Sequence, residues 1–390
     1  MLRRHVVPCV GPWKRCCTSA DVLAPNSTNI SVSRWLFGCA GVVAGVVVVG
    51  GITRLTESGL SIVEWKPLAG VVPPLTEQAW LEEFERYKKF PEFQQRPDTT
   101  LSQFKYIFFW EWFHRFLARS LGVAFGIPAV YYASRGRFTG HQGFQASLVG
   151  LFCLGGCQGA LGWYMVKSGL NKNLLDKRQK ATVSAYRLAS HLSLAFTIYV
   201  GMLTLAFSLR LPHYKLTFAK HLSSIKMLRG VAHGATGLMF VTAISGAFVA
   251  GLDAGLLYND TFPLMGTGVI PPIEDLTALS PLWRNLFENH SMAQLWHRLM
   301  AGGTTCGIIA LNVMARRSGV YPSVPLVARS LKLVNAALTI QVLLGMMTIM
   351  TYVHLHVAAS HQAGSLVLLT SLVYLSCILS SRGRALPIKA

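Results

Sequence analysis

The chain has 390 residues, of which 52% are hydrophobic and only 13% are charged, with a formal net charge of +20. This composition excludes a soluble domain, because apolar stretches repeatedly reach the roughly 20 residues that cross a bilayer. The positive charge lies in short connections between these stretches, where it indicates membrane orientation, so a nucleic-acid-binding protein is also excluded.

The first 33 residues are predicted to form a mitochondrial transit peptide or matrix tail. They carry Arg, Lys and Ser, with no acid before Asp21. They are too polar for the apolar region of a secretory signal and are typical of mitochondrial targeting. A disordered cytosolic tail is the alternative.

Eight membrane-spanning helices are predicted after this tail, so the fold class is an all-α polytopic membrane protein. The expected spans are residues 34–53, 104–132, 143–166, 184–208, 230–252, 292–315, 330–352 and 357–380. Lys and Arg fill the second, fourth and sixth connections, whereas thirteen of the sixteen acids lie in the first and fifth. Both termini therefore lie on the basic side, which is the matrix if the tail is a transit peptide.

The chain is predicted to be a tandem repeat of a four-helix unit. GGITRLTESGL at 50–60 matches GAFVAGLDAGL at 246–256, and a long acidic loop with a Pro-Pro pair follows each. The second span of each half carries His-Arg and the fourth carries Ser-His. Since four is even, we expect two four-helix bundles related by a pseudo-twofold axis along the membrane normal. The bundles are residues 34–210 and 230–382, with a matrix linker at 211–229 and a matrix tail at 383–390.

Four histidines are predicted to ligate metal. They lie on even-numbered spans, within about three turns of the acidic side, so each half offers two at one level. Two imidazoles from facing helices suit a flat macrocycle such as haem, whereas zinc would want four converging ligands. A satisfied core histidine is the alternative for each of them: His114, His191, His297 and His361.

Three other histidines are given no such role. His233 lies on an odd-numbered span near the basic face, where packing or a local hydrogen bond is expected. His354 and His356 flank the last connection, where a solvated loop is expected and contact with the edge of a haem is the alternative.

Three arginines are candidates for binding the carboxylates of a haem. Arg115 and Arg298 each follow a predicted ligand directly, and Arg187 precedes His191 by one helical turn. A planar guanidinium suits two carboxylates. The alternative is an arginine that extends to the lipid headgroups.

Glu111 distinguishes the two halves. It is the only acid inside a predicted span, and its counterpart beside the second His-Arg is Gln294. The i, i+3 spacing puts Glu111 on nearly the same face as His114. A carboxylate there could transfer protons, and a structural hydrogen bond to Arg or His is the alternative. The asymmetry suggests that one half carries out chemistry while the other holds a permanent haem.

Several motifs, in order across roughly residues 34–380, resemble haem A synthase of the mitochondrial type. They are GGITRLTESGLSIVEW, FPEF, EWFHR, LGWYMVKSGL, YRLASH, SGAFVAGLDAGL, NLFEN, HR and SHQAGS. The resemblance implies an inner-membrane oxidoreductase that converts the C8 methyl group of haem O to the formyl group of haem A, for cytochrome c oxidase. It implies that His297 and His361 hold a haem b cofactor, that His114 and His191 belong to the substrate-haem site, and that Glu111 is catalytic.

The resemblance also implies partners. These are haem O synthase upstream, a ferredoxin-type electron donor in the matrix, the lipid bilayer and further copies of the chain. The new oxygen atom comes from dioxygen or water. The alternatives are a diheme b-type electron-transfer cytochrome and a haem-delivery assembly factor. The inequality of Glu111 and Gln294 favours the enzyme, because a carrier has no need for unequal halves.

Overall fold

The computed structural model describes residues 27–66, 70–138, 141–170, 183–211 and 222–380. Within them the expected eight long apolar helices are present, which confirms the all-α membrane class. They are α1 (Ser27–Leu55), α4 (Leu101–Ser134), α5 (Gln142–Gly169), α7 (Ala185–Arg210), α8 (Leu222–Gly251), α11 (His290–Arg317), α13 (Pro325–Met350) and α14 (Leu355–Ser380). Most of the predicted transit peptide, residues 1–26, lies outside the described residues.

The helices extend beyond the apolar runs that predicted them. Helix α1 begins at Ser27, inside the predicted tail, and α8 begins at Leu222, inside the predicted linker. Helix α4 begins at a capping box, in which Thr100 and Gln103 bond each other's backbone amides. Such caps satisfy the first free N–H groups of a helix and fix its start.

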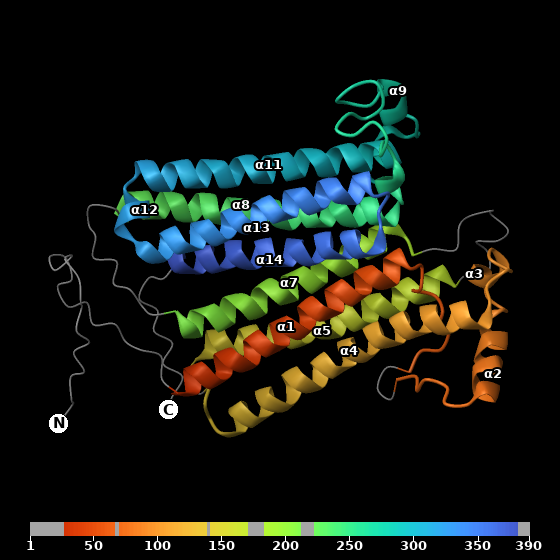
Figure 1. Cartoon of the computed structure of the whole chain (residues 1–390). Helices are drawn as coiled ribbons and strands as arrows, with labels where there is room; N and C mark the ends of the chain where they lie inside the picture. Colours follow the sequence, from red (N-terminus) through yellow and green to blue (C-terminus); the bar gives the residue numbers. More distant parts are fainter. Residues whose placement is uncertain (1–26, 67–69, 139–140, 171–182, 212–221, 381–390) are drawn as a thin grey trace.

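Helices α1, α7, α8 and α14 form the centre of the molecule, and α4, α5, α11 and α13 flank them (Figure 1). Helix α1 packs on α4 and α7, and α5 packs on α7; likewise α8 packs on α11 and α14, and α13 packs on α14. The halves meet where α1 and α7 contact α14 and α7 contacts α8. Both halves therefore use the same helix pairings. The pseudo-twofold axis itself stays a prediction.

The acidic loops form short helices at one end of the molecule, where Figure 1 places α2, α3 and α9. The first loop contributes α2 (Glu77–Tyr87) and α3 (Pro91–Gln94). The fifth loop contributes η2 (Ala254–Leu256), α9 (Ile273–Leu276), η3 (Leu282–Arg284) and α10 (Asn285–Glu288), and α12 (Val320–Ser323) lies in the sixth connection. Phe84 and Tyr87 of α2 pack on Phe104 and Phe108 of α4, which fixes the first loop against the start of that span.

The repeated motif also repeats its backbone geometry. Glu57 follows α1 and Asp253 follows α8, and both are left-handed, with φ of 52° and 53°. Few residues other than glycine adopt this conformation, which ends a helix. Asp253 is held by an ion pair with Arg54 of α1, at 2.9 Å, so the two repeated turns meet between the halves.

Candidate functional site

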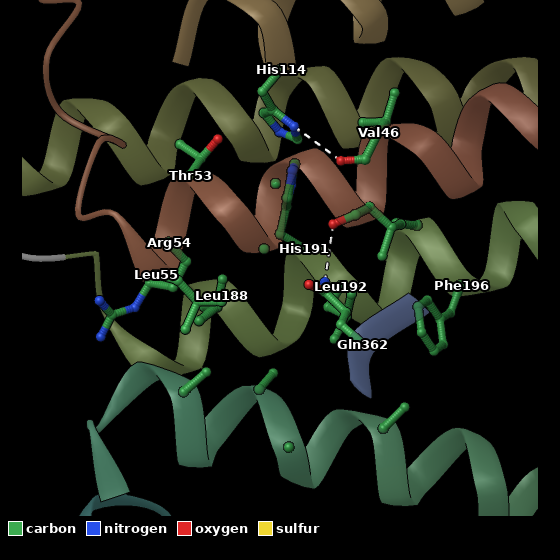
Figure 2. A pocket seen from close by; sticks show the side chains of 18 of the residues that line it. Val46, Thr53, Arg54, Leu55, His114, Leu188, His191, Leu192, Phe196 and Gln362 are labelled. Carbon is green, nitrogen blue, oxygen red and sulfur yellow. Dashed lines mark hydrogen bonds between the residues drawn. The ribbon is translucent and has the colours of Figure 1, made fainter. Parts of the chain in front are cut away.

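A single cavity of about 1710 Å³ reaches into both halves and is lined by all four candidate histidines. His114 comes from α4, His191 from α7, His297 from α11 and His361 from α14. Figure 2 shows His114 and His191 projecting into it beside α1. The cavity exceeds the roughly 300–1,000 Å³ of a common small-molecule site. It therefore offers room for ligands larger than a typical metabolite.

Each histidine faces a glycine on a neighbouring helix. A Cβ added to Gly50 of α1 would lie 2.7 Å from Cε1 of His114, and one on Gly246 of α8 would lie 3.1 Å from Cε1 of His297. Gly162 of α5 and Gly345 of α13 face His191 and His361 in the same way, at 3.2 and 2.9 Å. Any larger residue would displace the imidazole, so the glycines fix where each ring lies.

The ring centroids of His297 and His361 lie 6.5 Å apart. A metal–imidazole bond of about 2 Å, plus roughly 1 Å from nitrogen to ring centre, puts two trans imidazoles about 6 Å apart on one ion. The spacing of this pair is compatible with two imidazoles on one metal ion.

Two histidines are oriented by a hydrogen bond at Nδ1. His114 Nδ1 lies 3.1 Å from the carbonyl oxygen of Val46 (Figure 2), and His297 Nδ1 lies 2.8 Å from Ser245 Oγ. Ser245 Oγ donates its own proton to the carbonyl of Thr242, so it accepts from His297. Metal-ligating histidines commonly donate one nitrogen in this way, which leaves Nε2 for the metal.

The ligand count fits haem better than a bare ion. Among the described residues, no group of three or more His, Cys, Asp or Glu side chains is placed to hold a metal ion. A haem iron takes four nitrogens from its macrocycle and needs only two from the protein. Nδ1 of His191 is buried without a hydrogen-bond partner among the described residues, so this imidazole is not held by any protein group at that nitrogen.

Glu111 is 2% exposed, lines the cavity and accepts three hydrogen bonds. Ser61 Oγ and the backbone amide of Ile62 each donate to Oε2 at 2.7 Å, and Arg115 Nη2 donates to Oε1 at 2.6 Å. Arg115 also donates to the carbonyls of Ile62 and Glu64, at 3.0 Å each. Glu111 and Arg115 thus bind each other and the turn that follows α1.

In the second half, Gln294 and Arg298 bind the segment after α8, as Glu111 and Arg115 bind the turn after α1. Gln294 Nε2 donates to the carbonyls of Ala254 and Leu257, at 3.0 and 2.7 Å. Arg298 Nη1 donates to the carbonyl of Pro263 at 2.9 Å, but its Nε and Nη2 are buried without partners among the described residues. With no carboxylate to bind, this guanidinium keeps donors free to bind an anion in the cavity.

Arg187 lies apart from the other two candidate arginines. It donates to Ser168 Oγ at 2.7 Å, lies over the ring of Tyr164, and is not among the residues that line the cavity. Its assignment as a haem-carboxylate ligand stays a prediction without support from this geometry.

The family model of a cytochrome oxidase assembly protein matches residues 33–373. The chain belongs to this family.

Curated relatives of the family are similar over most of the chain. The heme A synthase of Bos taurus is 45% identical over 92% of this chain and 86% of its own length. The heme A synthase of Rhodospirillum centenum is 43% identical, over 94% and 90%. A heme A synthase–mitochondrial ferredoxin fusion protein of Schizosaccharomyces pombe is 41% identical, over 88% of this chain and 59% of the fusion.

Gln362 lies where the two halves of the chain meet, and the sequence patterns did not predict a role for it. Gln362 follows His361, and its Nε2 donates to the carbonyl of Val47 at 3.0 Å; Figure 2 shows this bond beside the one between Val46 and His114. Consecutive carbonyls of α1 thus bind a histidine of one half and the neighbour of a histidine of the other. Only the Gln after the Ser-His pair signals this, and its partner depends on how the halves pack.

Of the three other histidines named from the sequence, His233 and His354 lie as expected, whereas His356 lies in the first turn of α14 and not in a loop. Nδ1 of His233 is 2.7 Å from the carbonyl of Arg229, one turn earlier in α8, which confirms a local hydrogen bond. His354 and His356 are exposed beside the last connection. None of the three lines the cavity.

Gly345→Ala is expected to weaken binding of the ligand held by His297 and His361. The new Cβ would lie 2.9 Å from His361 Cε1, so the ring must move. Overpacking of this kind costs about 1–3 kcal/mol, which corresponds to roughly 5- to 150-fold in affinity. The pigment bound per mole of purified protein measures the loss. Gly302→Ala on α11, where a Cβ meets nothing within 4 Å, is the control and should bind normally.

Proposed function

We propose that this chain is a haem A synthase, an oxidoreductase that converts the C8 methyl group of haem O to the formyl group of haem A for cytochrome c oxidase assembly. The observation that carries the proposal is one cavity with two histidine pairs and unequal neighbours, Glu111 in one half and Gln294 in the other. The names of the curated relatives support it.

The C-terminal pair, His297 and His361, holds haem b. The 6.5 Å spacing of their rings and the free donors of Arg298 support this assignment, because a haem brings both an iron and carboxylates. Bound haem b supplies one-electron redox chemistry. Ser245 and Gly345 orient the two imidazoles, and Arg298 binds a haem carboxylate.

The N-terminal pair, His114 and His191, positions haem O. Glu111 and Arg115 hold the turn at Ser61 and Ile62 against the same end of the cavity, so they shape the wall beside the substrate. Leu188, Leu192 and Phe196 of α7 add apolar wall below His191 (Figure 2). Gln362 connects the two haem sites through α1.

The protein is a multi-pass membrane protein of the mitochondrion, and we place it in the inner membrane with both termini in the matrix. A ferredoxin-type protein supplies the electrons; the fused ferredoxin of the Schizosaccharomyces pombe relative supports this class of donor. Haem O synthase as the source of substrate and self-association are carried over from the family resemblance.

Extraction of the pigments from the purified full-length chain tests the function. We expect haem b together with haem O or haem A, because only an enzyme of this kind needs two different macrocycles. Chromatography of the extracted haems makes the measurement. Haem b alone, at two per chain, would instead indicate an electron-transfer cytochrome, and no tightly held haem b would indicate a delivery factor.

A further inference from the structure

Glu92, in the FPEF motif, is a buried acid that the proposed reaction does not yet use. It lies on α3 in the first acidic loop, is 7% exposed and lines the cavity. Tyr87, at the end of α2, hydrogen-bonds its carboxyl group. The other oxygen, Oε2, is buried without a hydrogen-bond partner among the described residues.

Glu92 differs from every other acid that lines the cavity. Glu111 pairs with Arg115, Glu57 with Arg96, and Asp253 with Arg54. Glu92 has no cationic partner in the described part of the chain. A buried carboxylate without a partner is costly, so such a group keeps its proton.

The surroundings of Glu92 also favour its protonated form. Burial and the negative charge of Glu111 raise the pKa of Glu92 to about 8, and the hydrogen bond from Tyr87 only partly opposes this. The charged or titratable groups around it are Tyr87 from α2, Glu111 with Arg115 from α4, and the pair of Glu57 and Arg96 at the rim. Glu92 is therefore a neutral acid at neutral pH and can release a proton.

Glu92 also lies between solvent and the reactive half. Gln95 and Arg96, which follow it closely along the chain, are exposed and line the same cavity. Glu111, whose charge acts on Glu92, lies one helical turn before His114. In the second half, the described residues of the fifth connection that line the cavity include one acid, Asp253, which is paired. Among the described residues, the second half thus has no counterpart of Glu92.

Conversion of a methyl to a formyl group requires protons to move between the solvent and the cavity, whatever the source of oxygen. With water, R–CH3 and H2O give R–CHO, four electrons and four protons. With dioxygen, R–CH3, two O2, four electrons from the donor and four protons give R–CHO and three H2O. A titratable side chain between the solvent and the cavity can carry them.

We propose that Glu92 is the proton-transfer residue of the reactive half, which exchanges protons between the solvent on the acidic side and the substrate haem site. The proposal rests on the proposed function. In each transfer the carboxylic acid of Glu92 gives a proton to a base in the cavity, and the carboxylate regains one from water at the rim near Arg96. With water as the oxygen source, the same steps run in reverse.

Glu92→Gln is expected to lower the rate of haem A formation about 100-fold, because an amide keeps the shape and the acceptor for Tyr87 but cannot donate and regain a proton. The full chain in lipid nanodiscs is supplied with haem O, a reduced ferredoxin-type donor and air. The content of haem b and the summed content of haem O and haem A should equal those of the wild type. Glu83→Gln is the control, since Glu83 is 5% exposed on α2, pairs with Arg86 and does not line the cavity.

A second readout does not depend on turnover. The raised pKa means that the folded chain loses stability relative to the unfolded chain as pH rises from the ordinary carboxyl value towards about 8. Glu92→Gln should therefore melt at the wild-type temperature at about pH 5 but above it at about pH 9. The infrared band of a protonated carboxylic acid, lost from the wild type as pH rises through about 8, should be missing from the variant.

The outcomes separate the two proposals. If the wild type forms no haem A, the proposed function fails. If the wild type forms haem A and Glu92→Gln keeps its rate, or Glu83→Gln loses as much, the role of Glu92 is overturned. A variant that melts below the wild type at both pH values would also overturn it, because Glu92 would then be an ionised structural group.

Discussion

His361→Ala is expected to remove the tightly held haem b and to bring haem A formation below detection. The imidazoles of His297 and His361 are spaced for one iron, and alanine leaves that iron with a single protein ligand. If haem b passes electrons from the donor to the N-terminal half, as proposed, its loss stops the reaction. Haem O should still bind there, because its histidines lie on α4 and α7 and are untouched. Optical spectra of the reduced protein and extraction of its haems measure both effects.

His233→Ala is the matched control for this prediction. His233 is also an intramembrane histidine, but its ring bonds the backbone of its own helix and does not line the cavity. Its replacement should leave both pigments in place. Loss of haem b with His233→Ala and its retention with His361→Ala would contradict the assignment. Loss of haem O in place of haem b would mean that His361 belongs to the substrate site, so that the roles of the two halves are the reverse of those proposed.

The eight spans follow from the sequence because they depend on local patterns. A run of apolar residues predicts a helix wherever it packs, and the matched GGITRLTESGL and GAFVAGLDAGL segments align the two halves. The helix ends were less predictable. Helices α1 and α8 begin in polar sequence before the apolar run, since a helix needs only its own backbone bonds to extend.

The contacts of the site depend on packing that no local pattern encodes. The expectation for Arg187 used its spacing from His191, but α5 presents Ser168 and Tyr164 to it. The partner of Gln362 is a carbonyl on α1, in the other half of the chain. Glu92 was visible only as part of a family motif, because its burial requires Phe84 and Tyr87 to pack against α4.

Glu111→Gln is expected to lower haem A formation roughly 5- to 150-fold while the haem b content stays unchanged. The carboxylate accepts from Ser61, Ile62 and Arg115, and an amide offers only one acceptor oxygen. Whichever way the amide turns, its NH2 group meets a buried donor. An unsatisfied donor of this kind costs about 1–3 kcal/mol and loosens the turn beside the substrate. Haem extraction and the rate of haem A formation measure the two effects, and an unchanged rate would remove Glu111 from the mechanism.

The same variant tests whether the two acids act together. The negative charge of Glu111 raises the pKa of Glu92, so its removal should lower that pKa. Glu92 would then lose its proton at a lower pH, and the residual activity should decline on the alkaline side at lower pH than in the wild type. Gln294→Glu provides the reverse case, because it sets a carboxylate against the carbonyls of Ala254 and Leu257. It should lower the haem b content and leave the pH dependence of activity unchanged. A shift of that pH dependence only in Glu111→Gln would show that it comes from the charge of Glu111.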